Sequence, residues 1–580
     1  MYRKCYQGKK LGSNYFEMHL WEEEGGHQII PYNNLAYQEC DEEDHSFRGL
    51  NGEYLKSTSK WFFSKNPDYS AKNTSGLHFH DMKPHQKFLV ERYGVNDVPS
   101  TGHREVFFDI ECEIGGALTE EYIESAPMPI TSIAWWDKTP DTWHILILDK
   151  KSQLKHTKAK NREIIPCATE NELLAKFVEH IREMDPDILV GYNSDYFDIP
   201  YLYYRMCNTI GQDWADHLSP IGKVTSKKNN KYFFKQNQYV DIVGIESLDY
   251  IRLHKKYSWK DEPSWKLDAI GEKYVGMNKI EYEGNLDQLF ATDIHKFIQY
   301  NFVDVEILQK LDEKLQYIAL TKNLAHKGKH NYSEVYANSI TQDGAISAYL
   351  LSQNIIPPPK EPNPQKKDNY AGGYLFCPKA GLYKYMFDED LTSLYPSIIM
   401  SINIGKETFV GRIVDANDRN NRLGLNDLKN MDPTSLLLVE NNKRRQTNIE
   451  VSELIKIIKT QKLAVAANGS MFRTDKEAVL STILKKWFEE RVVYKNRMKK
   501  AYKSGDTEAG EYNHLMQYTM KILLNSLYGA TALPSFRYGM NFQTLSEAIT
   551  LSGHRIIQES ALCANRHMNK VMKGEIKLDI

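Results

Sequence analysis

This sequence lacks several features that mark whole classes of protein. Its seven cysteines are scattered, odd in number and without a Cys-x-x-Cys pair. That pattern argues against a disulfide scaffold and a zinc or iron–sulfur site, and it indicates a reducing cytosol. No apolar run approaches ~18 residues, so no transmembrane helix is expected. Residues 1–12 lack the apolar segment of a secretion signal.

A strong charge of one sign is also missing. The chain has 74 basic and 76 acidic residues, for a formal net charge of −2. This balance argues against a wholly basic nucleic-acid binder, but it permits a basic cleft among acidic faces. At 580 residues the chain is too long for one core, so roughly three to five domains are expected.

An apolar strand is expected at 104–116, and it carries two acids. Asp109 and Glu111 alternate with Phe108 and Ile110, so the period of a strand places both carboxylates on one face. Two such acids on an otherwise apolar strand are costly to bury without a cation. The stretch therefore indicates a metal site. The alternative is an edge strand with a solvated acidic face.

Two later segments carry acids on helices. In 188–205 an apolar strand, a Gly-Tyr-Asn turn and a helix follow one another, and Asp198 stands at the helix start. An aspartate there is also a natural N-cap. Segment 295–311 is helical by its apolar spacing, and Tyr300 and Asp304 share a face at i and i+4. For that pair the alternative is a partly buried tyrosine near a surface acid.

The stretch 388–399 joins an acidic run to a Tyr-Pro-Ser corner and an apolar helix start. Asp390 ends the acidic run. A carboxylate at a strand end beside a backbone turn suits a hard metal ion next to a phosphate. Most aspartates in such places are turn formers or helix caps, so the stretch alone leaves both interpretations open.

Two long helices with basic faces are expected after residue 480. The first carries Arg491 and Lys495 at i and i+4, and the second places Lys521, Asn525 and Tyr528 on one face. Positive charge from two antiparallel helices suits a triphosphate clamp that closes by helix motion. The alternative is a solvated hairpin of two basic helices.

Three of these segments together resemble the motifs of a known family. The strings DIE, NSDYFD and YNFVD occur in the order and separation of the three proofreading-exonuclease motifs of family B DNA polymerases. The resemblance implies an RNase H-like α/β domain in which two divalent cations, roughly 3.5–4 Å apart, serve phosphodiester hydrolysis. By this resemblance Asp109, Glu111, Asp198 and Asp304 hold the cations, and Tyr300 orients the water.

Motifs A and B of the same family's polymerase domain are matched as well. DLTSLYPSI at 390–398 resembles motif A, and KILLNSLYG at 521–529 matches motif B, Kx3NSxYG. Motif A implies that Asp390 binds both catalytic cations and that Tyr395 packs under the sugar, which favours dNTP over NTP. For Tyr395 the alternative is a plain packing aromatic. The implied triphosphate contacts are the backbone amides of Leu391, Thr392, Ser393 and Leu394 and the side chains of Arg491, Lys495 and Lys521, while Asn525 and Tyr528 line the nascent base pair.

The segment between the two sets of motifs contains a junction and a glycine loop. Proline density at 355–364 disfavours helix and strand pairing, which is typical of a domain junction. Tyr370, Gly372 and Gly373 follow it, and adjacent glycines let the backbone approach another chain closely. This loop resembles the YxGG loop that contacts template phosphates in the family.

Two further features belong to the exonuclease part. Segment 224–240 has β-rich flanks around a basic polar turn and is expected to form a hairpin. In similar polymerases such a hairpin helps move the primer strand to the exonuclease site, and the alternative is an exposed loop. Lys279 is a further candidate for lining that site.

The resemblance implies a multidomain α/β fold with a partial α+β palm and antiparallel helical fingers. It also implies Mg²⁺, two ions per site, for which Mn²⁺ is able to substitute. The expected domains are an N-terminal domain at 1–103 joined by 318–362, an exonuclease domain at 104–317, a first palm part at 363–470, fingers at 471–534 and a second palm part at 535–580.

One element of the family pattern is missing from this sequence. Motif C, typically a hairpin with Gly-Asp-Thr-Asp-Ser, supplies further acids to the polymerase site. The nearest match is 505–508, which precedes motif B and lies between two expected helices, so we interpret it as their turn. Three explanations stay open: one subunit of a split phage polymerase, a shortened sequence, or a degenerate polymerase kept as an exonuclease. Intact motifs A and B argue against the last. The overall resemblance is to the T-even-type phage group, some members of which split this gene, and it favours the first.

The leading hypothesis is the N-terminal part of a replicative DNA polymerase of the T-even-type phage group. Its expected partners are primer-template DNA, dNTP, a second polypeptide with motif C and thumb, and a sliding clamp reached through that polypeptide. The expected location is the cytoplasm of an infected bacterium, with no membrane contact. The alternatives are a stand-alone 3′→5′ exonuclease and a regulatory subunit that only binds nucleic acid.

Overall fold

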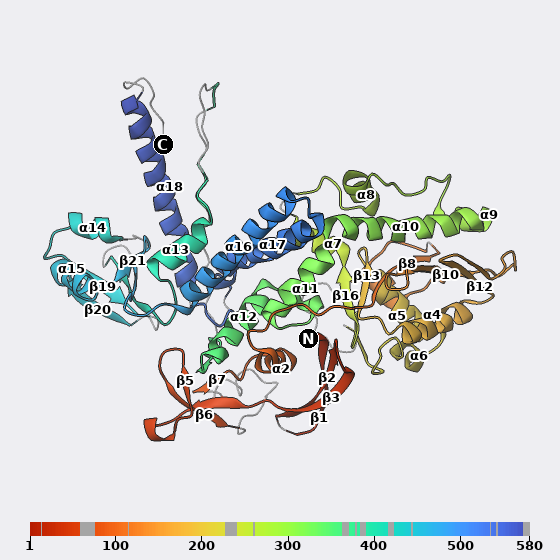
Figure 1. The fold of residues 1–580 in the computed structure, drawn as a ribbon, viewed down its shortest axis with the longest axis horizontal. Helices are drawn as coiled ribbons and strands as arrows, with labels where there is room; N and C mark the ends of the chain where they lie inside the picture. The colour runs from red at the N-terminus through yellow and green to blue at the C-terminus, as the bar shows by residue number, and fades with distance from the viewer. Residues whose placement is uncertain are drawn as a thin grey trace. The chain divides into compact units, whose positions relative to one another are not determined.

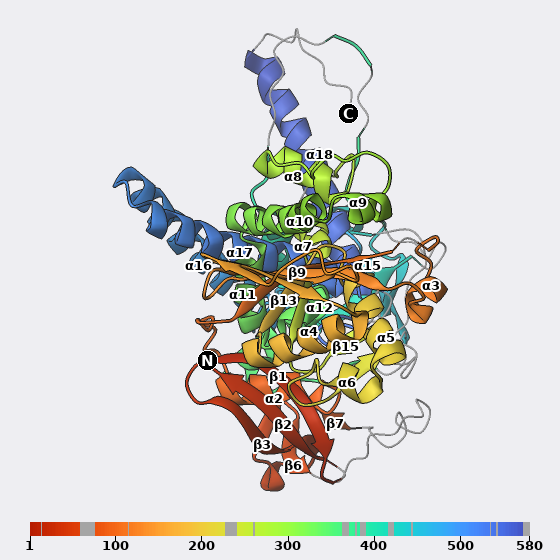
Figure 2. The same cartoon turned by 90° about the vertical axis from the view of Figure 1, so that its right-hand side faces the viewer.

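A computed structural model provides the structure, and Figures 1 and 2 show it in two views. The described residues are 1–580 except 13, 59–75, 114, 227–239, 259–260, 362–370, 377–379, 383–389, 416–422, 442–444, 534, 541–542 and 572–580. Tyr370 and most of the expected hairpin at 224–240 therefore lie outside the described residues.

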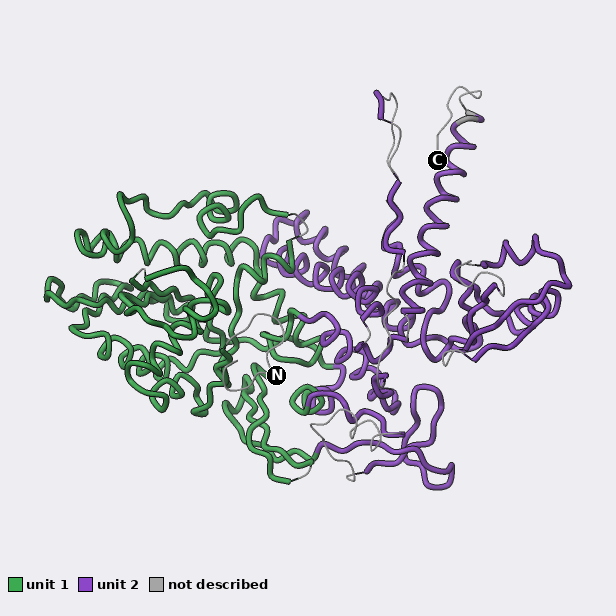
Figure 3. The backbone as a smooth tube through the Cα atoms, turned by 180° about the vertical axis from the view of Figure 1, so that it is seen from behind, with its two compact units in different colours: residues 1–33, 84–89, 96–336 green, residues 34–83, 90–95, 337–580 purple. Residues whose placement is uncertain are grey.

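The chain forms two compact units, coloured separately in Figure 3. Unit 1 comprises residues 1–33, 84–89 and 96–336, and unit 2 comprises 34–83, 90–95 and 337–580. The first hundred residues thus contribute to both units. Helix α2 (Pro84–Tyr93) spans a boundary between them.

Unit 1 is built around a mixed sheet. Its seven described strands lie in the order β11-β12-β10-β9-β8-β13-β16, and β8 pairs with β9 antiparallel and with β13 in parallel. A parallel strand in the middle of a sheet has both faces covered, which explains the nearly continuous apolar runs here. The bounds are β8 (Glu105–Cys112), β9 (Ile130–Asp137), β10 (Thr142–Leu148), β11 (Thr157–Ala159), β12 (Arg162–Cys167), β13 (Ile188–Gly191) and β16 (Glu246–Asp249).

Helices cover both faces of this sheet, as Figures 1 and 2 show. Helix α10 (Ile294–Leu315) packs on β8 and β9 from one side. Helices α4 (Glu170–Met184) and α5 (Asp198–Thr209) pack from the other side. Val106, Phe108 and Ile110 face the α4 and α5 side and belong to a large apolar core, so the alternate residues of β8 face α10.

The rest of unit 1 consists of small elements. Strands β1 to β3 form an antiparallel sheet, and β14 pairs with β15 antiparallel at the flanks of the expected hairpin. Their bounds are β1 (Tyr2–Lys10), β2 (Tyr15–Glu22), β3 (Gly26–Asn33), β14 (Val224–Ser226) and β15 (Val240–Ile242), and the helices are α3 (Glu120–Ser125), α6 (Gln212–Asp216), α7 (Tyr250–Tyr257), α8 (Leu267–Val275), α9 (Leu286–Thr292), α11 (Tyr317–Gly328) and η2 (Tyr332–Glu334).

Unit 2 contains two small sheets and the long helices. One sheet pairs β17 (Ile355–Ile356) in parallel with β5 (Phe47–Gly49). The expectation of no strand pairing at 355–364 is therefore wrong for its first two residues, which precede Pro357 and keep their backbone N–H donors. The same sheet contains β4 (Ala36–Glu39), β6 (Tyr54–Thr58) and β7 (Leu77–His78). The helices of unit 2 outside residues 405–465 are η1 (Glu42–Asp44), α12 (Asn338–Ser352), α13 (Leu394–Ile402), α16 (Val479–Lys503), α17 (Thr507–Thr531) and α18 (Thr544–Val571).

The described residues of 405–465 form short strands and helices around a small apolar core. Val451, Leu454 and Ile458 recur at helical spacing and pack with Ile413 and Leu437 from two strands. The elements are β18 (Phe409–Val414), α14 (Leu425–Asn430), β19 (Leu436–Glu440), β20 (Gln446–Glu450), α15 (Val451–Thr460), β21 (Ala464–Val465) and β22 (Ser470–Phe472). Across the described part of the chain, no helix combines the length and apolarity needed to cross a membrane.

Candidate functional site

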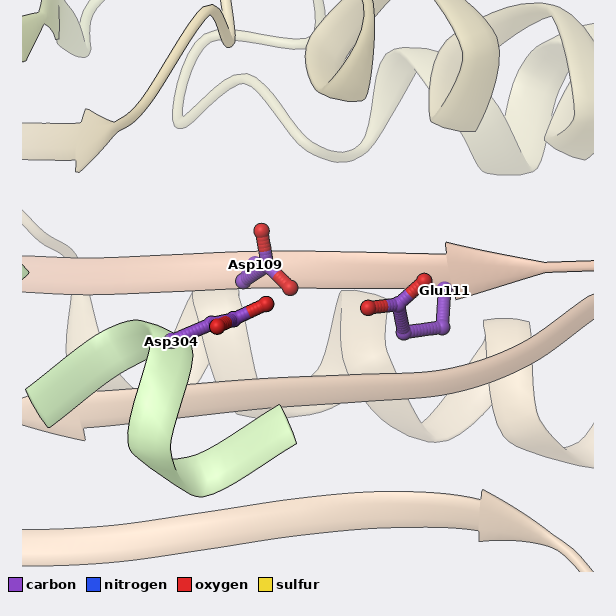
Figure 4. Close-up of side chains that lie close together, drawn as sticks. All are labelled: Asp109, Glu111 and Asp304. Carbon is purple, nitrogen blue, oxygen red and sulfur yellow. The ribbon is translucent and has the colours of Figure 1, made fainter. Parts of the chain in front are cut away.

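Strand β8 brings the first two candidate acids together. Asp109 and Glu111 stand two residues apart on the face that meets α10, as the strand period predicted. Each offers one oxygen that lies within 4.8 Å of the other and of an oxygen of Asp304, and Figure 4 shows the three carboxylates gathered between strand and helix. Because β8 is a central strand, the alternative of a solvated edge strand is wrong.

Helix α10 supplies the third acid and a tyrosine. Tyr300 and Asp304 are both buried, at 7% and 2% exposure, so the alternative of a surface acid is wrong. Lys279, in the loop after α8, places its Nζ 2.6 Å from Asp304 Oδ2 and donates to the Tyr300 hydroxyl at 3.1 Å. The backbone amide of Lys279 is itself held by Asp268, at 2.7 Å.

Asp198 approaches the cluster from the opposite layer. It is the first residue of α5, and the strand, turn and helix expected around it are confirmed. Its Oδ1 accepts from the backbone amide of Ile110 on β8, at 3.4 Å. Asp198 is not among the three acids whose oxygens lie within 4.8 Å of one another. Its charge nevertheless contributes to raising the pKa of Asp109 and of Glu111.

The electrostatics of the cluster show a surplus of negative charge. Burial, and then the neighbouring carboxylates, raise the pKa of Asp109 well above its ordinary value. Burial and Asp304 raise the pKa of Glu111 to about 8, and burial raises that of Asp198 to about 7. Burial alone would lower the pKa of Lys279, but Asp304 and Asp109 outweigh it and raise that pKa.

The chemistry of these donors fits a hard divalent cation. Carboxylate oxygens are the preferred ligands of Mg²⁺, and Asp304 Oδ1 is buried with no hydrogen-bond partner among the described residues. A buried polar atom without a partner is costly unless something satisfies it. A cation next to this oxygen would satisfy it and would offset the repulsion among the acids.

Sequence reasoning missed one residue of this site. Asn301, directly after Tyr300, donates its amide to Asp109 Oδ2 at 2.8 Å, and Ser132 on β9 donates to Asn301 Oδ1 at 2.8 Å. The available signal was an asparagine between Tyr300 and Phe302 in the interior of a helix, where asparagine is disfavoured. Only the packing of α10 on β8 and β9 shows what it bonds.

Unit 2 contains the other candidate residues. Asp390 is exposed and precedes α13, whose N-cap Ser393 has a positive φ of 52°. Tyr395, on the first turn of α13, packs on Tyr528 of α17 with ring centroids 4.4 Å apart. The structure therefore brings the candidate tyrosines of motifs A and B together. In the described residues Asp390 is not part of a group of three close metal-ligand side chains.

The two expected basic helices are confirmed as α16 and α17, packed on each other. The Nε of Arg491 is buried without a hydrogen-bond partner in the described residues, and its burial lowers the pKa. Lys495 is exposed, Lys521 is half-buried 6.0 Å from the ring centre of Tyr518, and Asn525 is exposed.

The turn between these helices explains the near match to motif C. Gly505 has a φ of +78°, and Asp506 caps α17 by accepting from the amide of Ala509 at 3.1 Å. The segment is thus the turn that the sequence predicted. In the glycine loop, the Gly372 carbonyl lies 2.7 Å from the ring Nε2 of His554 on α18, and a side chain at Gly373 would come within 3.6 Å of the Tyr395 hydroxyl.

The mixed α/β domain brings together carboxylates from a central strand and a neighbouring helix. Such a group of acids is suited to divalent-cation chemistry. Comparison with known families identifies the domain further. Residues 87–270 match the exonuclease domain of DNA polymerase family B, and residues 336–579 match DNA polymerase family B. The chain therefore belongs to family B of the DNA polymerases and carries its exonuclease and polymerase domains.

Comparisons with individual proteins lead to the same family. The chain is 30% identical over 438 residues to the DNA-directed DNA polymerase of Escherichia phage RB69, covering 71% of this chain and 47% of that protein. It is 28% identical over 433 residues to that of Enterobacteria phage T4, covering 70% and 47%. A DNA polymerase of Pyrococcus glycovorans is 26% identical over 352 residues, covering 57% and 40%. The chain thus spans about half the length of these relatives.

Proposed function

We propose that this chain is the N-terminal part of a replicative DNA polymerase and that residues 104–317 form a 3′→5′ proofreading exonuclease with an RNase H-like fold. The observation that carries the proposal is the group Asp109, Glu111 and Asp304, whose oxygens lie within 4.8 Å of one another. Two of these acids lie inside the exonuclease match, which ends at 270 before α10.

We further propose that Asp109, Glu111, Asp198 and Asp304 hold two Mg²⁺ ions, or Mn²⁺ in their place. Divalent cations bound there would supply charge stabilisation and an activated water for phosphodiester hydrolysis. Asp198, at the start of α5, completes the set from the layer opposite α10. The raised pKa values of the carboxyls support this assignment, because perturbed titration marks functional clusters.

Tyr300 and Lys279 have the geometry to handle the substrate. The Tyr300 oxygen accepts from Lys279 at 3.1 Å, and a side-chain hydrogen bond from the Tyr300 hydroxyl to Asp304 acts to lower the pKa of that carboxyl. That hydroxyl would orient the attacking water or a phosphate oxygen. Lys279 would hold the Asp304 carboxylate in place and add positive charge beside the scissile phosphate.

For the polymerase part we propose the roles implied by motifs A and B. Asp390 would bind the catalytic cations, and Tyr395, in contact with the Tyr528 ring, would lie under the sugar of the dNTP. The Arg491 side chain, buried at Nε yet unbonded there in the described residues, would turn its guanidinium to the triphosphate. The other proposed contacts are the amides of Leu391, Thr392, Ser393 and Leu394, the side chains of Lys495, Lys521 and Asn525, and the Tyr370, Gly372 and Gly373 loop on DNA.

We propose that a second polypeptide supplies motif C and thumb, and that a sliding clamp is reached through it. The proposal rests on the resemblance to the polymerases of the T-even-type phage group. Domain boundaries at 103, 317, 362, 470 and 534 and a location in the infected host's cytoplasm belong to the same proposal. A stand-alone exonuclease is the second candidate, favoured by the one close group of acids in the described residues.

Two assays on the purified chain test these proposals. With Mg²⁺, the chain should degrade single-stranded DNA from the 3′ end, and Asp109→Ala should abolish this. Primer extension should require a polypeptide that begins in a motif C hairpin. Extension by the chain alone would contradict the two-polypeptide proposal. Degradation that persists in Asp109→Ala would contradict the exonuclease assignment, and DNA binding with neither activity would favour a regulatory subunit.

A further inference from the structure

Three buried polar groups form a chain from strand β9 to the acid cluster. The Ser132 hydroxyl donates to Asn301 Oδ1, and Asn301 Nδ2 donates to Asp109 Oδ2, each at 2.8 Å. Ser132 and Asn301 are completely buried. Both ends of the Asn301 amide are therefore bonded, and the hydroxyl of Ser132 favours the orientation that turns the NH₂ group to Asp109.

The buried helical position of Asn301 is energetically unfavourable for an amide side chain. Asparagine is disfavoured in a helix interior, and burial of its polar atoms is costly unless they are bonded. The neighbouring positions on α10 carry Tyr300 and Asp304, so this hydrogen bond joins helix and strand at the level of the acids. An apolar side chain would pack α10 on the sheet without this cost. The amide therefore needs a reason beyond packing.

We propose that Asn301 is a positioning residue that fixes the Asp109 carboxylate for cation binding, and that Ser132 fixes Asn301. This inference rests on the proposed exonuclease function. A carboxylate has about four lone-pair sites, so one hydrogen bond from a neutral amide orients Asp109 and leaves most of them open. Asn301 also leaves the charge of Asp109 intact for a cation, whereas an ammonium in its place would neutralise it.

Loss of such an outer partner typically lowers metal affinity or activity by about 10–100-fold. Asn301→Leu should therefore weaken Mn²⁺ binding, titrated by calorimetry, by about 10–100-fold. It should lower kcat for degradation of single-stranded DNA by a similar factor and leave KM for DNA unchanged. Ser132→Ala should shift both quantities in the same direction by less, because the amide of Asn301 remains.

A matched control separates positioning from general stability. Asn323 on α11 is also buried, at 6% exposure, and its amide donates to the carbonyl of Ala319 at 2.8 Å, without contact with the acids. Asn323→Leu should leave Mn²⁺ affinity unchanged. Equal losses of affinity in Asn323→Leu and Asn301→Leu would overturn the inference.

The remaining outcomes are also decisive. If Asn301→Leu fails to fold by circular dichroism, Ser132→Ala carries the test, and unchanged affinity and kcat in that variant overturn the proposal. Asp109→Ala is measured in parallel. If Asp109→Ala loses degradation while both positioning variants behave like the unmodified chain, only the positioning role is wrong. If Asp109→Ala still degrades DNA, the proposed exonuclease function itself is wrong.

Discussion

The two units bury charge in opposite ways. In unit 1, Asp109, Glu111 and Asp304 converge, and the nearby cation Lys279 contacts Asp304. In unit 2, Arg537 is completely buried. It bonds Asp343 at 2.8 Å, Asp81 at 2.5 Å and the carbonyl of Pro358 at 2.6 Å. The cluster in unit 1 has an excess of negative charge. In unit 2 the two aspartates are matched by two cations, Arg537 and Lys360, whose Nζ lies 3.7 Å from Asp343.

The pKa shifts follow that difference. In the acid cluster, burial and mutual repulsion raise the pKa of Asp109 and Glu111, so the carboxyls resist ionisation. Around Arg537 burial would raise the pKa of Asp81, but the guanidinium outweighs it and holds that pKa below its ordinary value. A surplus of buried charge of one sign indicates a ligand-binding site, and balanced buried charge indicates a structural role.

The largest expected effect comes from breaking the balanced cluster. Arg537→Met removes the buried cation that bonds both Asp81 and Asp343, so the free energy of unfolding should fall by about 3–5 kcal/mol. Denaturant titration measures it. Adding Asp343→Leu should recover part of the loss. The control is Arg555→Met, since Arg555 is 57% exposed in its pair with Glu559 and should matter by less than about 1 kcal/mol. Similar losses in both would contradict the architectural role of Arg537.

The second-largest effect is expected on exonuclease activity, which should depend on acids of unit 1 and not on Asp390 of unit 2. Asp109→Ala should lower single-strand degradation with Mg²⁺ by more than the ~100-fold that loss of an outer partner costs, because a ligand itself is removed. Asp390→Ala, in unit 2, should leave degradation unchanged and abolish any primer extension. The readout is the rate of 3′ shortening of a labelled strand. Loss of degradation in Asp390→Ala would show that the two sites are not independent.

Periodicity predicted which acids share a face of one strand or one helix, and the resemblance to family B polymerases implied that these faces come together. A strand period of two fixed Asp109 and Glu111 on one face, and helical spacing fixed Tyr300 and Asp304. The partners of these acids were not predictable in the same way. Asn301 bonds Asp109 across 192 residues, and such a contact depends on how α10 crosses the sheet. No local pattern encodes that crossing.

The balanced cluster of unit 2 left no usable signal in the sequence. Asp81, Asp343 and Arg537 are far apart in the chain and lie in unrelated segments, so only the fold brings them together. The small core within 405–465 is hard to recognise in the sequence for a related reason. Its apolar residues are shared among short strands and one amphipathic helix, so no single window of sequence looks like a core.

The unliganded acid cluster should make stability depend on pH in a definite direction. Carboxyls whose pKa is raised in the fold, to about 8 for Glu111 and about 7 for Asp198, keep their protons where the unfolded chain has lost them. Their contribution to stability is full below about pH 4 and is lost as pH rises to about 7–8, with a slope of about 1.4 kcal/mol per pH unit for each retained proton. Thermal unfolding with a chelator should therefore show Tm falling from pH 5 to pH 8 more steeply than in the double variant Asp109→Asn and Glu111→Gln. Saturating Mg²⁺ should flatten the dependence. Parallel curves with and without these carboxyls would remove the cluster as the cause.

The smallest expected effect concerns Lys279, the partial substitute for a cation. Its side chain is 32% exposed, so Lys279→Met should cost about 1 kcal/mol with a chelator present at pH 8. With saturating Mg²⁺ the cost should shrink, because bound cations supply the positive charge that the ammonium gave to Asp304. Lys273→Met is the matched control: Lys273 is 44% exposed and pairs with the buried Glu262, away from the acid cluster. Its cost should be the same with chelator and with Mg²⁺. If the loss of unfolding free energy in Lys279→Met is the same with and without Mg²⁺, Lys279 and the cations do not balance the same carboxylates. The surplus negative charge of unit 1 would then need another explanation.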